Sequence, residues 1–174
     1  MTPVSEDFQI RPATRADVPV ILQLIRDLAT YERSPNDVTA TEELLLRVLF
    51  GEKPAAEVRL AYEGDEAVGF AIFFHNFSTW LGRQGLYLED LFVKPEHRGK
   101  GYGRALLADL ARIAQERECG RMEWAVLDWN EPAIQFYRKL GAQPMHEWTV
   151  FRLTGDEIAT LAAAGGISSE KQSA

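Results

Sequence analysis

The fold is decided by residues 86–104, Leu-Tyr-Leu-Glu-Asp-Leu-Phe-Val-Lys-Pro-Glu-His-Arg-Gly-Lys-Gly-Tyr-Gly-Arg. Bulky apolar residues up to Val93 predict a largely buried strand, and Pro95 ends it because proline cannot donate to a sheet ladder. A glycine-rich segment, residues 98–103, then precedes an amphipathic run over residues 105–114 that predicts a helix. Glycine permits positive φ and close backbone approach, so the stretch predicts a strand, a tight turn and a helix.

The start of this helix has the chemistry of an anion site. Orphan backbone N–H groups and the positive end of the helix dipole face outward there, and Arg98, Lys100 and Arg104 add full charges that suit a pyrophosphate. The turn lacks the G-x-x-x-x-G-K-[ST] spacing of a nucleotide triphosphate loop and the full G-x-G-x-x-G dinucleotide fingerprint. A plain tight turn is the structural alternative.

Composition sets broad limits. The chain has 174 residues, a hydrophobic fraction of 46% and a net charge of −7. It predicts one domain over residues 1–164 and a flexible tail over 165–174, and no apolar run approaches the roughly 20 residues that span a bilayer. The single Cys119 and an N-terminus without a secretory signal favour the cytoplasm. The acidic charge argues against nucleic acid as a partner, and no membrane partner is expected.

The rest of the chain alternates between helical and strand patterns. Thr14 and Thr41 resemble helix caps, and glycine in residues 63–66 suggests a hairpin turn between antiparallel strands. The expected elements are a strand at 8–11, helices at 15–31 and 42–51, strands at 57–62, 67–74, 121–127 and 145–153, and helices at 132–141 and 155–163.

A loop is expected over residues 75–85, and it carries two large aromatic residues. Trp80 is therefore a candidate for contact with substrate, because loops on a rigid scaffold often carry binding groups, although core packing explains such residues more often. His75, His97 and His146 are scattered without metal-ligand spacing, so no metal site is predicted.

A second motif, N-x-P-A-x-x-F-Y-x-x-L-G-A, occupies residues 130–142. Together with R-x-x-G-x-G after the central strand, it resembles the acetyl-CoA-binding motifs of the GCN5-related N-acetyltransferases over about residues 8–153. The resemblance implies an α/β fold with a mixed, mostly antiparallel central sheet and helices on both faces. Within that superfamily, residues 86–93 and 128–137 are most similar to the diamine (spermidine/spermine) acetyltransferases.

This resemblance also implies roles for individual residues. Glu89 and Tyr137 are the expected catalytic residues. The expected acetyl-CoA contacts are Leu91, Phe92, Val93, Arg98, Gly99, Lys100, Gly101, Tyr102, Gly103, Arg104, Asn130, Pro132, Ala133 and Tyr137. The expected amine site comprises Tyr31, Glu32, Glu89, Asp90 and Glu147, with Trp80 added from the loop composition. A homodimer that shares C-terminal strands is implied as well.

The chemistry can be argued from the residues themselves. An alkylammonium with a pKa near 10.4 is free amine in only about one part in 10³ at neutral pH, so a base must take its proton. Glu89 is the candidate base, and its neighbour Asp90 would raise its pKa. A backbone N–H near Leu91 or Phe92 would hold the oxyanion if the strand bulges there, and Tyr137 would protonate the leaving thiolate. The alternatives are a solvated strand end and a core tyrosine.

Three classes of function follow. The first is an acetyl-CoA-dependent transferase acting on a polyamine or on another small amine such as a lysine analogue. The second is an acetyltransferase for a protein N-terminus or lysine. The third is a non-catalytic acyl-CoA-binding module, which is disfavoured because both the glycine turn and Tyr137 are present.

Overall fold

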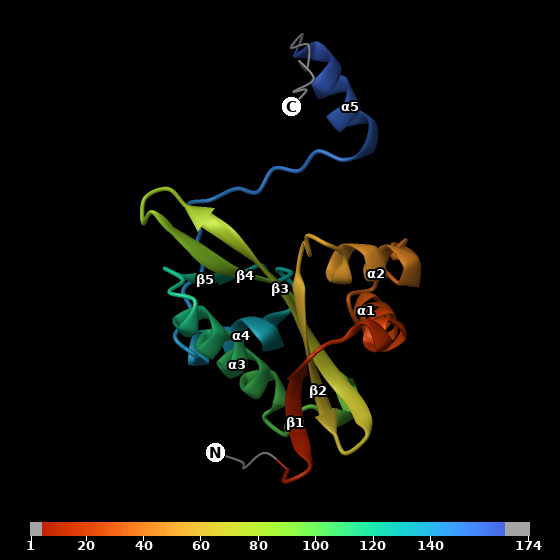
Figure 1. Cartoon of the computed structure of the whole chain (residues 1–174). Helices are drawn as coiled ribbons and strands as arrows, with labels where there is room; N and C mark the ends of the chain where they lie inside the picture. The colour runs from red at the N-terminus through yellow and green to blue at the C-terminus, as the bar shows by residue number, and fades with distance from the viewer. Residues whose placement is uncertain (1–4, 166–174) are drawn as a thin grey trace. The chain divides into compact units, whose positions relative to one another are not determined.

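The computed structural model describes residues 5–165, and its centre is a five-stranded sheet with the order β1-β2-β3-β4-β5 (Figure 1). The first four strands are antiparallel to their neighbours, whereas β5 runs parallel to β4. The strands are β1 Phe8–Pro12, β2 Glu57–Glu63, β3 Glu66–Ser78, β4 Arg83–Val93 and β5 Met122–Trp124.

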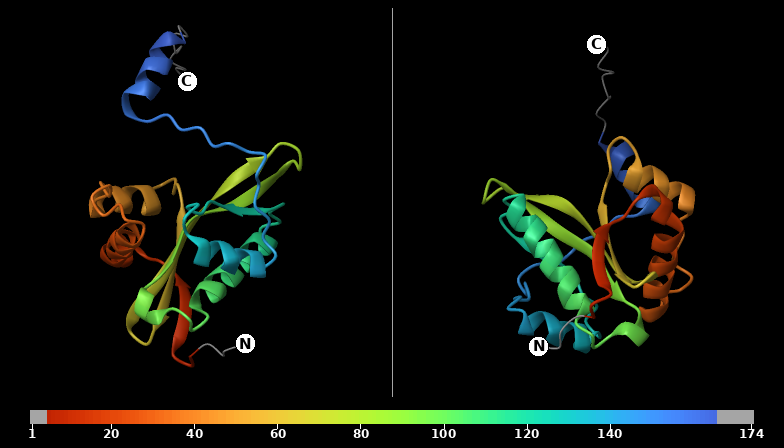
Figure 2. Two further views of the ribbon diagram at one scale, coloured as in Figure 1. Left: turned by 180° about the vertical axis from the view of Figure 1, so that it is seen from behind. Right: turned by 60° about the horizontal axis from the view of Figure 1, so that its bottom comes forward.

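The chain divides into two compact units, Met1–Leu127 and Asp128–Ala174. In the first unit, α1 (Val18–Tyr31) and α2 (Glu42–Phe50) cover one face of the sheet, and α3 (Tyr102–Glu116) covers the other (Figures 1 and 2). The second unit contains α4 (Glu131–Lys139) and α5 (Gly155–Ala164). The predicted class is thereby confirmed as a mixed, mostly antiparallel sheet with helices on both faces.

A partly buried ion pair between Arg11 and Asp17 fixes the start of α1. The backbone N–H of Thr14 donates to the carboxylate of Asp17 at 2.7 Å, which is the contact that the N3 residue makes in the predicted capping box, and the hydroxyl of Thr14 donates to the same carboxylate at 2.7 Å. Arg11 of β1 donates to both carboxylate oxygens of Asp17, at 2.7 and 2.9 Å, and also to the hydroxyl of Tyr62. These contacts hold the pKa of Asp17 well below its usual range and tie the helix to the edge of the sheet.

From that start, α1 packs along the sheet. Its apolar side chains meet those of β2, β3 and β4 in one buried cluster, whose central members are Ile21, Leu24, Leu28, Leu60, Phe70, Ile72 and Phe92. Tyr31, the last residue of α1, packs against this cluster. The end of α1 is therefore held close to Phe92, near the end of β4.

The segment predicted as a loop over residues 75–85 is mostly strand. β3 continues to Ser78 and β4 begins at Arg83, so the loop prediction is wrong except for the turn between them. The two strands pair from Phe74 with Tyr87 to Ser78 with Arg83, and the rings of Phe74 and Tyr87 are 5.1 Å apart. Cross-strand pairing overrides the weak strand propensity of a segment rich in Asn, Ser and Gly.

The C-terminal unit departs from prediction at residues 145–153. No strand forms there, and the apolar side chains are exposed, with Phe151 at 91%. The alternating pattern satisfied the local requirement for a strand, but a strand also needs a partner edge, and this segment pairs with none in the described part of the chain. The strand predicted over 121–127 is shortened to Met122–Trp124.

The ends of the chain add two findings. The predicted last helix is confirmed as α5, although the side chain of Thr154 makes no capping hydrogen bond. Of the tail predicted over residues 165–174, all but Gly165 lies outside the described residues.

Between residues 5 and 165, no helix is long and apolar enough to cross a membrane.

Candidate active site

A β-bulge in β4 shapes the centre of the candidate site. Asp90 is paired with Ile72 and Leu88 with Phe73, so Glu89 is an extra residue on β4 with no partner on β3. Leu91 and Phe92 pair with β3 in regular register. The bulge therefore lies at Glu89, and not at Leu91 or Phe92, where a backbone N–H was predicted to hold the oxyanion. Asp90 and its neighbour Phe92 lie opposite Ile72 and Phe70, on the face that α1 and α2 cover.

Three carboxylates gather near this bulge. Asp90 is half-buried, and burial, together with the charges of Glu89 and Glu32, raises its pKa to about 6. Glu32 caps the C-terminal end of α1, and burial raises the pKa of its carboxyl as well. Glu89 is exposed. The structure therefore brings together Glu32, Glu89 and Asp90, which were predicted as amine-site residues, with Tyr31 beside Glu32.

The glycine turn has the backbone geometry that was expected of it. Gly99 and Gly101 have φ of 78° and 85°, in the left-handed region that favours glycine, and Gly101 is the residue before α3. Among residues 5–165, no side chain makes a capping hydrogen bond at the N-terminal end of this helix. The first turn of α3 therefore offers the unpaired N–H groups that suit an anion.

Two of the three predicted cationic side chains contact other parts of the protein. Arg98 donates from Nε to the backbone oxygen of Val93 at 2.9 Å, and its guanidinium lies over the ring of Tyr31, 4.2 Å from the centroid. Lys100 donates to both carboxylate oxygens of Glu63, at 2.8 and 3.0 Å. Arg104 is exposed on α3.

Glu63 is a residue that sequence reasoning missed. Besides Lys100, its carboxylate accepts a hydrogen bond from the hydroxyl of Tyr102 at 2.5 Å and lies 2.7 Å from Nδ1 of His97. Hydrogen bonds from Lys100, Tyr102 and His97 lower the pKa of Glu63 to about 2. The ring of Tyr102 is buried and stacked on Phe8, so its side chain holds the start of α3 in place.

Glu66, Glu96 and His97 bring one potential ligand atom each to within 4.8 Å of one another, which is a spacing that metal sites share. Lys94 donates to Glu66 at 2.7 Å, and His97 is held by Glu63. Ion pairs and hydrogen bonds within the protein therefore explain why these side chains lie together. Glu66 and Glu96 are exposed.

The remaining predicted residues belong to the C-terminal unit. Asn130 is buried and caps α4, accepting a hydrogen bond from the backbone N–H of Ala133 at 3.4 Å. Pro132 lies in the first turn of α4 and Gly141 ends the helix region with φ of 91°, as predicted. Tyr137 is half-buried, with its ring 5.3 Å from that of Phe136. Glu147 is exposed in the segment after α4.

Trp80 lies in the turn between β3 and β4 and is 90% exposed. The strand from Arg83 to Asp90 extends over roughly 20 Å at about 3.3 Å per residue. The structure therefore does not bring Trp80 to the carboxylates at the bulge of the same chain. Its role in binding substrate stays a prediction.

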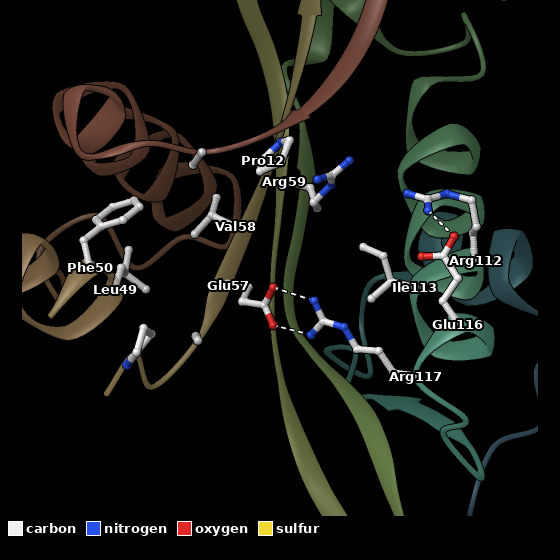
Figure 3. A pocket seen from close by; sticks show the side chains of 13 residues that line it. Pro12, Leu49, Phe50, Glu57, Val58, Arg59, Arg112, Ile113, Glu116 and Arg117 are labelled. Atoms are coloured by element: carbon white, nitrogen blue, oxygen red, sulfur yellow. Dashed lines mark hydrogen bonds and ion pairs between the residues drawn. The ribbon is translucent and has the colours of Figure 1, made fainter. Parts of the chain in front are cut away.

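A pocket of about 340 Å³ lies elsewhere in the first unit, between α2, β2 and α3 (Figure 3). Its charged side chains are paired: Arg117 with Glu57, and Arg112 with Glu116 at 2.6 Å. Arg59 at its border donates to Asp109 of α3 at 2.6 Å. None of the predicted site residues lines it. The pairs Arg117–Glu57 and Arg59–Asp109 attach the C-terminal half of α3 to β2, whereas Arg112–Glu116 lies within the helix.

Comparison with known proteins identifies the class that this fold and glycine turn define. A model described as the Acetyltransferase (GNAT) family matches residues 20–142, which is most of the chain. The chain belongs to this family and is an N-acetyltransferase. Acetyltransferases of this family use acetyl-CoA.

Individual relatives agree with this assignment. Thialysine N-epsilon-acetyltransferase of Bos taurus is 40% identical over 164 residues, which cover 88% of this chain and 96% of the relative. L-ornithine N5-acetyltransferase of Arabidopsis thaliana is 33% identical over 198 residues, covering 88% and 87%. An integron cassette protein from the mobile metagenome of V. cholerae has a similar structure, with a TM-score of 0.77, 28% identity and coverage of 91% and 99%.

The raised pKa of Asp90 predicts that this residue lowers stability at neutral pH. In the unfolded chain an aspartate has a pKa of about 3.9, so the folded state disfavours the ionised form and stability falls as pH rises through about 6. Asp90→Asn should raise the free energy of unfolding by about 1–2 kcal/mol at pH 8 and by little at pH 4. Chemical denaturation at both values measures this.

Asp27→Asn is the matched control, since Asp27 makes only an exposed hydrogen bond with Gln23, and it should change the unfolding free energy little at either pH. A loss of stability in Asp90→Asn at pH 8 would contradict the account, because it would mean that a partner stabilises the ionised carboxylate.

Proposed function

We propose that this enzyme transfers the acetyl group of acetyl-CoA to the side-chain amine of a small amino acid of the lysine or ornithine type. The observation that carries the proposal is the group of three carboxylates, Glu32, Glu89 and Asp90, next to the bulge of β4. The relatives named for thialysine and ornithine support the same choice. Both of those compounds carry a second ammonium group at a distance from the reacting amine.

The cluster has more acidic groups than proton transfer needs. If Glu89 takes the proton of the reacting ammonium, Asp90 and Glu32 remain to hold the distal ammonium by charge-assisted hydrogen bonds. Asp90 is largely ionised at neutral pH with a pKa of about 6, although its burial has a cost. A cationic acceptor would relieve that cost, because it supplies the positive charge that the described contacts of Asp90 lack.

Diamines and polyamines are the second candidate acceptors. They also present two ammonium groups, so the same carboxylates suit them, and they differ from the amino acids by lacking a carboxylate. Cadaverine and putrescine are the decarboxylated counterparts of lysine and ornithine, and each pair isolates this one difference. A protein N-terminus or lysine is a third candidate, to which a peptide substrate is the direct probe.

For the acetyl donor, we propose that the turn and the first residues of α3 bind its pyrophosphate. Backbone N–H groups after Gly101 would donate to the phosphate oxygens, and Arg98, Lys100 and Arg104 would add charge. Leu91, Phe92 and Val93 would border the pantetheine arm. In the C-terminal unit, Asn130, which caps α4, and Pro132, Ala133 and Tyr137 of α4 would also contact the donor. The donor brings a thioester, whose carbonyl carbon is the electrophile for direct attack by the amine.

Proton transfers complete the proposed reaction. Glu89, exposed at the bulge, removes a proton from the acceptor ammonium directly or through a water molecule. The free amine forms the new C–N bond, and the C–S bond breaks as the tetrahedral intermediate collapses. Tyr137 then donates its hydroxyl proton to the departing thiolate, and the proton that the new amide nitrogen must lose restores the Tyr137 hydroxyl, while Glu89 releases its proton to solvent. Glu147 and Trp80 remain candidates for further contacts with the amine.

The role of Tyr137 predicts a selective loss of catalytic rate. Tyr137→Phe keeps the ring and removes the proton donor, so kcat should fall by roughly 10²-fold or more while acetyl-CoA affinity changes little. Steady-state kinetics and titration calorimetry measure the two quantities. Phe136→Leu is the control for disturbed packing within α4. A kcat within about twofold of the wild type would assign Tyr137 a structural role.

The role of Glu32 predicts a loss that depends on the second ammonium of the acceptor. Glu32→Gln should raise KM for thialysine by about 10- to 100-fold, since a charge-assisted contact is worth about 1.5–3 kcal/mol, and should leave KM for a monoamine of equal length nearly unchanged. Glu42→Gln, on an exposed surface of α2, is the control. Equal increases for both substrates would contradict the assigned contact.

We also propose that the enzyme is a homodimer whose C-terminal segments are exchanged or paired between subunits. The support is the exposed apolar pattern of residues 145–153, which includes Trp148, Val150 and Phe151. Val150→Asp combined with Phe151→Asp should give a monomer in sedimentation equilibrium, where the wild type sediments as a dimer. A wild-type monomer at all protein concentrations would contradict this proposal.

A further inference from the structure

The side chain of Arg98 joins three parts of the first unit. Its Nε–H donates to the backbone oxygen of Val93 at 2.9 Å, next to the end of β4. Its guanidinium lies 4.2 Å from the ring centroid of Tyr31, the last residue of α1, and 5.7 Å from that of Phe92. The rings of Tyr31 and Phe92 are 6.5 Å apart. Arg98 therefore contacts the end of α1 while its backbone belongs to the turn before α3.

The guanidinium can serve two neighbours at once. Its flat face stacks on an aromatic ring, whereas its N–H groups point outward in its own plane. With Nε committed to Val93, the N–H groups on Nη1 and Nη2 suit a phosphate oxygen. An anion at the turn would therefore fix the plane of the guanidinium and, with it, the ring that lies against that plane.

Tyr31 links the guanidinium of Arg98 to the carboxylates at the bulge of β4. Glu32 follows Tyr31 directly, as the residue that caps the C-terminal end of α1, and the N–H of Glu32 donates to the backbone oxygen of Leu28 at 2.8 Å. Glu32 is close enough to Asp90 for the two charges to interact. Asp90 and Phe92 lie on one face of β4, so the aromatic stack and the carboxylates are neighbours on that face.

We propose that Arg98 is a positioning residue that couples the two substrate sites, with its stack on Tyr31 transmitting occupation of the glycine turn to Glu32 and Asp90. This inference rests on the proposed function, because it takes the turn as the acetyl-CoA site and the carboxylates as the amine site. Coupling of this kind is reciprocal, so each ligand strengthens binding of the other by the same factor. A stack that only stabilises the fold produces no such factor.

Titration calorimetry with coenzyme A and thialysine tests the coupling, because coenzyme A has no acetyl group and the ternary complex does not react. In the wild-type protein, saturating thialysine should lower the Kd of coenzyme A by about fivefold or more, in the range typical of coupled sites. Tyr31→Phe keeps the ring and should keep this ratio. Tyr31→Leu and Arg98→Met should bring it close to one.

Arg98→Lys distinguishes the effect of the stack on coupling between the two ligands from the effect of the positive charge on coenzyme A binding. It keeps the positive charge but loses the flat face and the Nε contact, so it should bind coenzyme A more tightly than Arg98→Met and still show a ratio close to one. Thermal melts establish that each variant is folded. If Tyr31→Leu does not fold, the two variants of Arg98 carry the comparison, since that side chain is exposed.

A wild-type ratio near one overturns the inference, and so does a ratio that survives in Arg98→Met and Arg98→Lys. Acetylation of thialysine by the wild-type enzyme is measured separately. Turnover without coupling overturns the inference and leaves the proposed function intact. No acetylation of any amino acid, diamine or peptide acceptor overturns the proposed function, and the inference with it.

Discussion

The constraint on which the structure depends is the chain reversal between β4 and α3. Gly101 has φ of 85° immediately before the helix, a conformation that a residue with a side chain adopts only at a cost. This reversal leaves the first N–H groups of α3 without capping side chains. Because β4 leads into the turn, the same strand that carries Glu89 and Asp90 at its bulge also ends next to the proposed anion site.

The cationic and acidic side chains of the candidate site lie on opposite sides of the end of β4. The cationic residues follow the end of β4, and the acidic residues precede it, at the bulge and at the end of α1. An acetyl donor with a pyrophosphate and an acceptor with two ammonium groups match this separation. Glu63, the last residue of β2, accepts hydrogen bonds from Lys100 and Tyr102. It therefore offsets the positive charge of Lys100 and fixes the position of the glycine turn.

Sequence reasoning succeeded where the determinants are local. The capping box of Thr14 and Asp17, the hairpin at Gly64 and the glycine turn were all predicted, because each depends on residues within a few positions. Prediction from the sequence failed where contacts between residues far apart in the chain decide the structure. Residues 75–78 and 83–85 form strand because they pair with each other, residues 145–153 form no strand because they have no partner among the described residues, and Glu63 is 37 residues from Lys100.

Gly103, in the first turn of α3, allows a test of the proposal that the start of this helix binds the pyrophosphate of acetyl-CoA. A Cβ added there would be 3.9 Å from Val93 Cγ2, an ordinary contact, and an acidic residue in the first turn favours the helix itself. Calorimetric titration of Gly103→Asp and Gly103→Ser compares a charged with a neutral side chain. Gly103→Asp should melt like Gly103→Ser but bind acetyl-CoA at least about 10-fold more weakly. Equal affinity of the two folded variants would contradict the proposal.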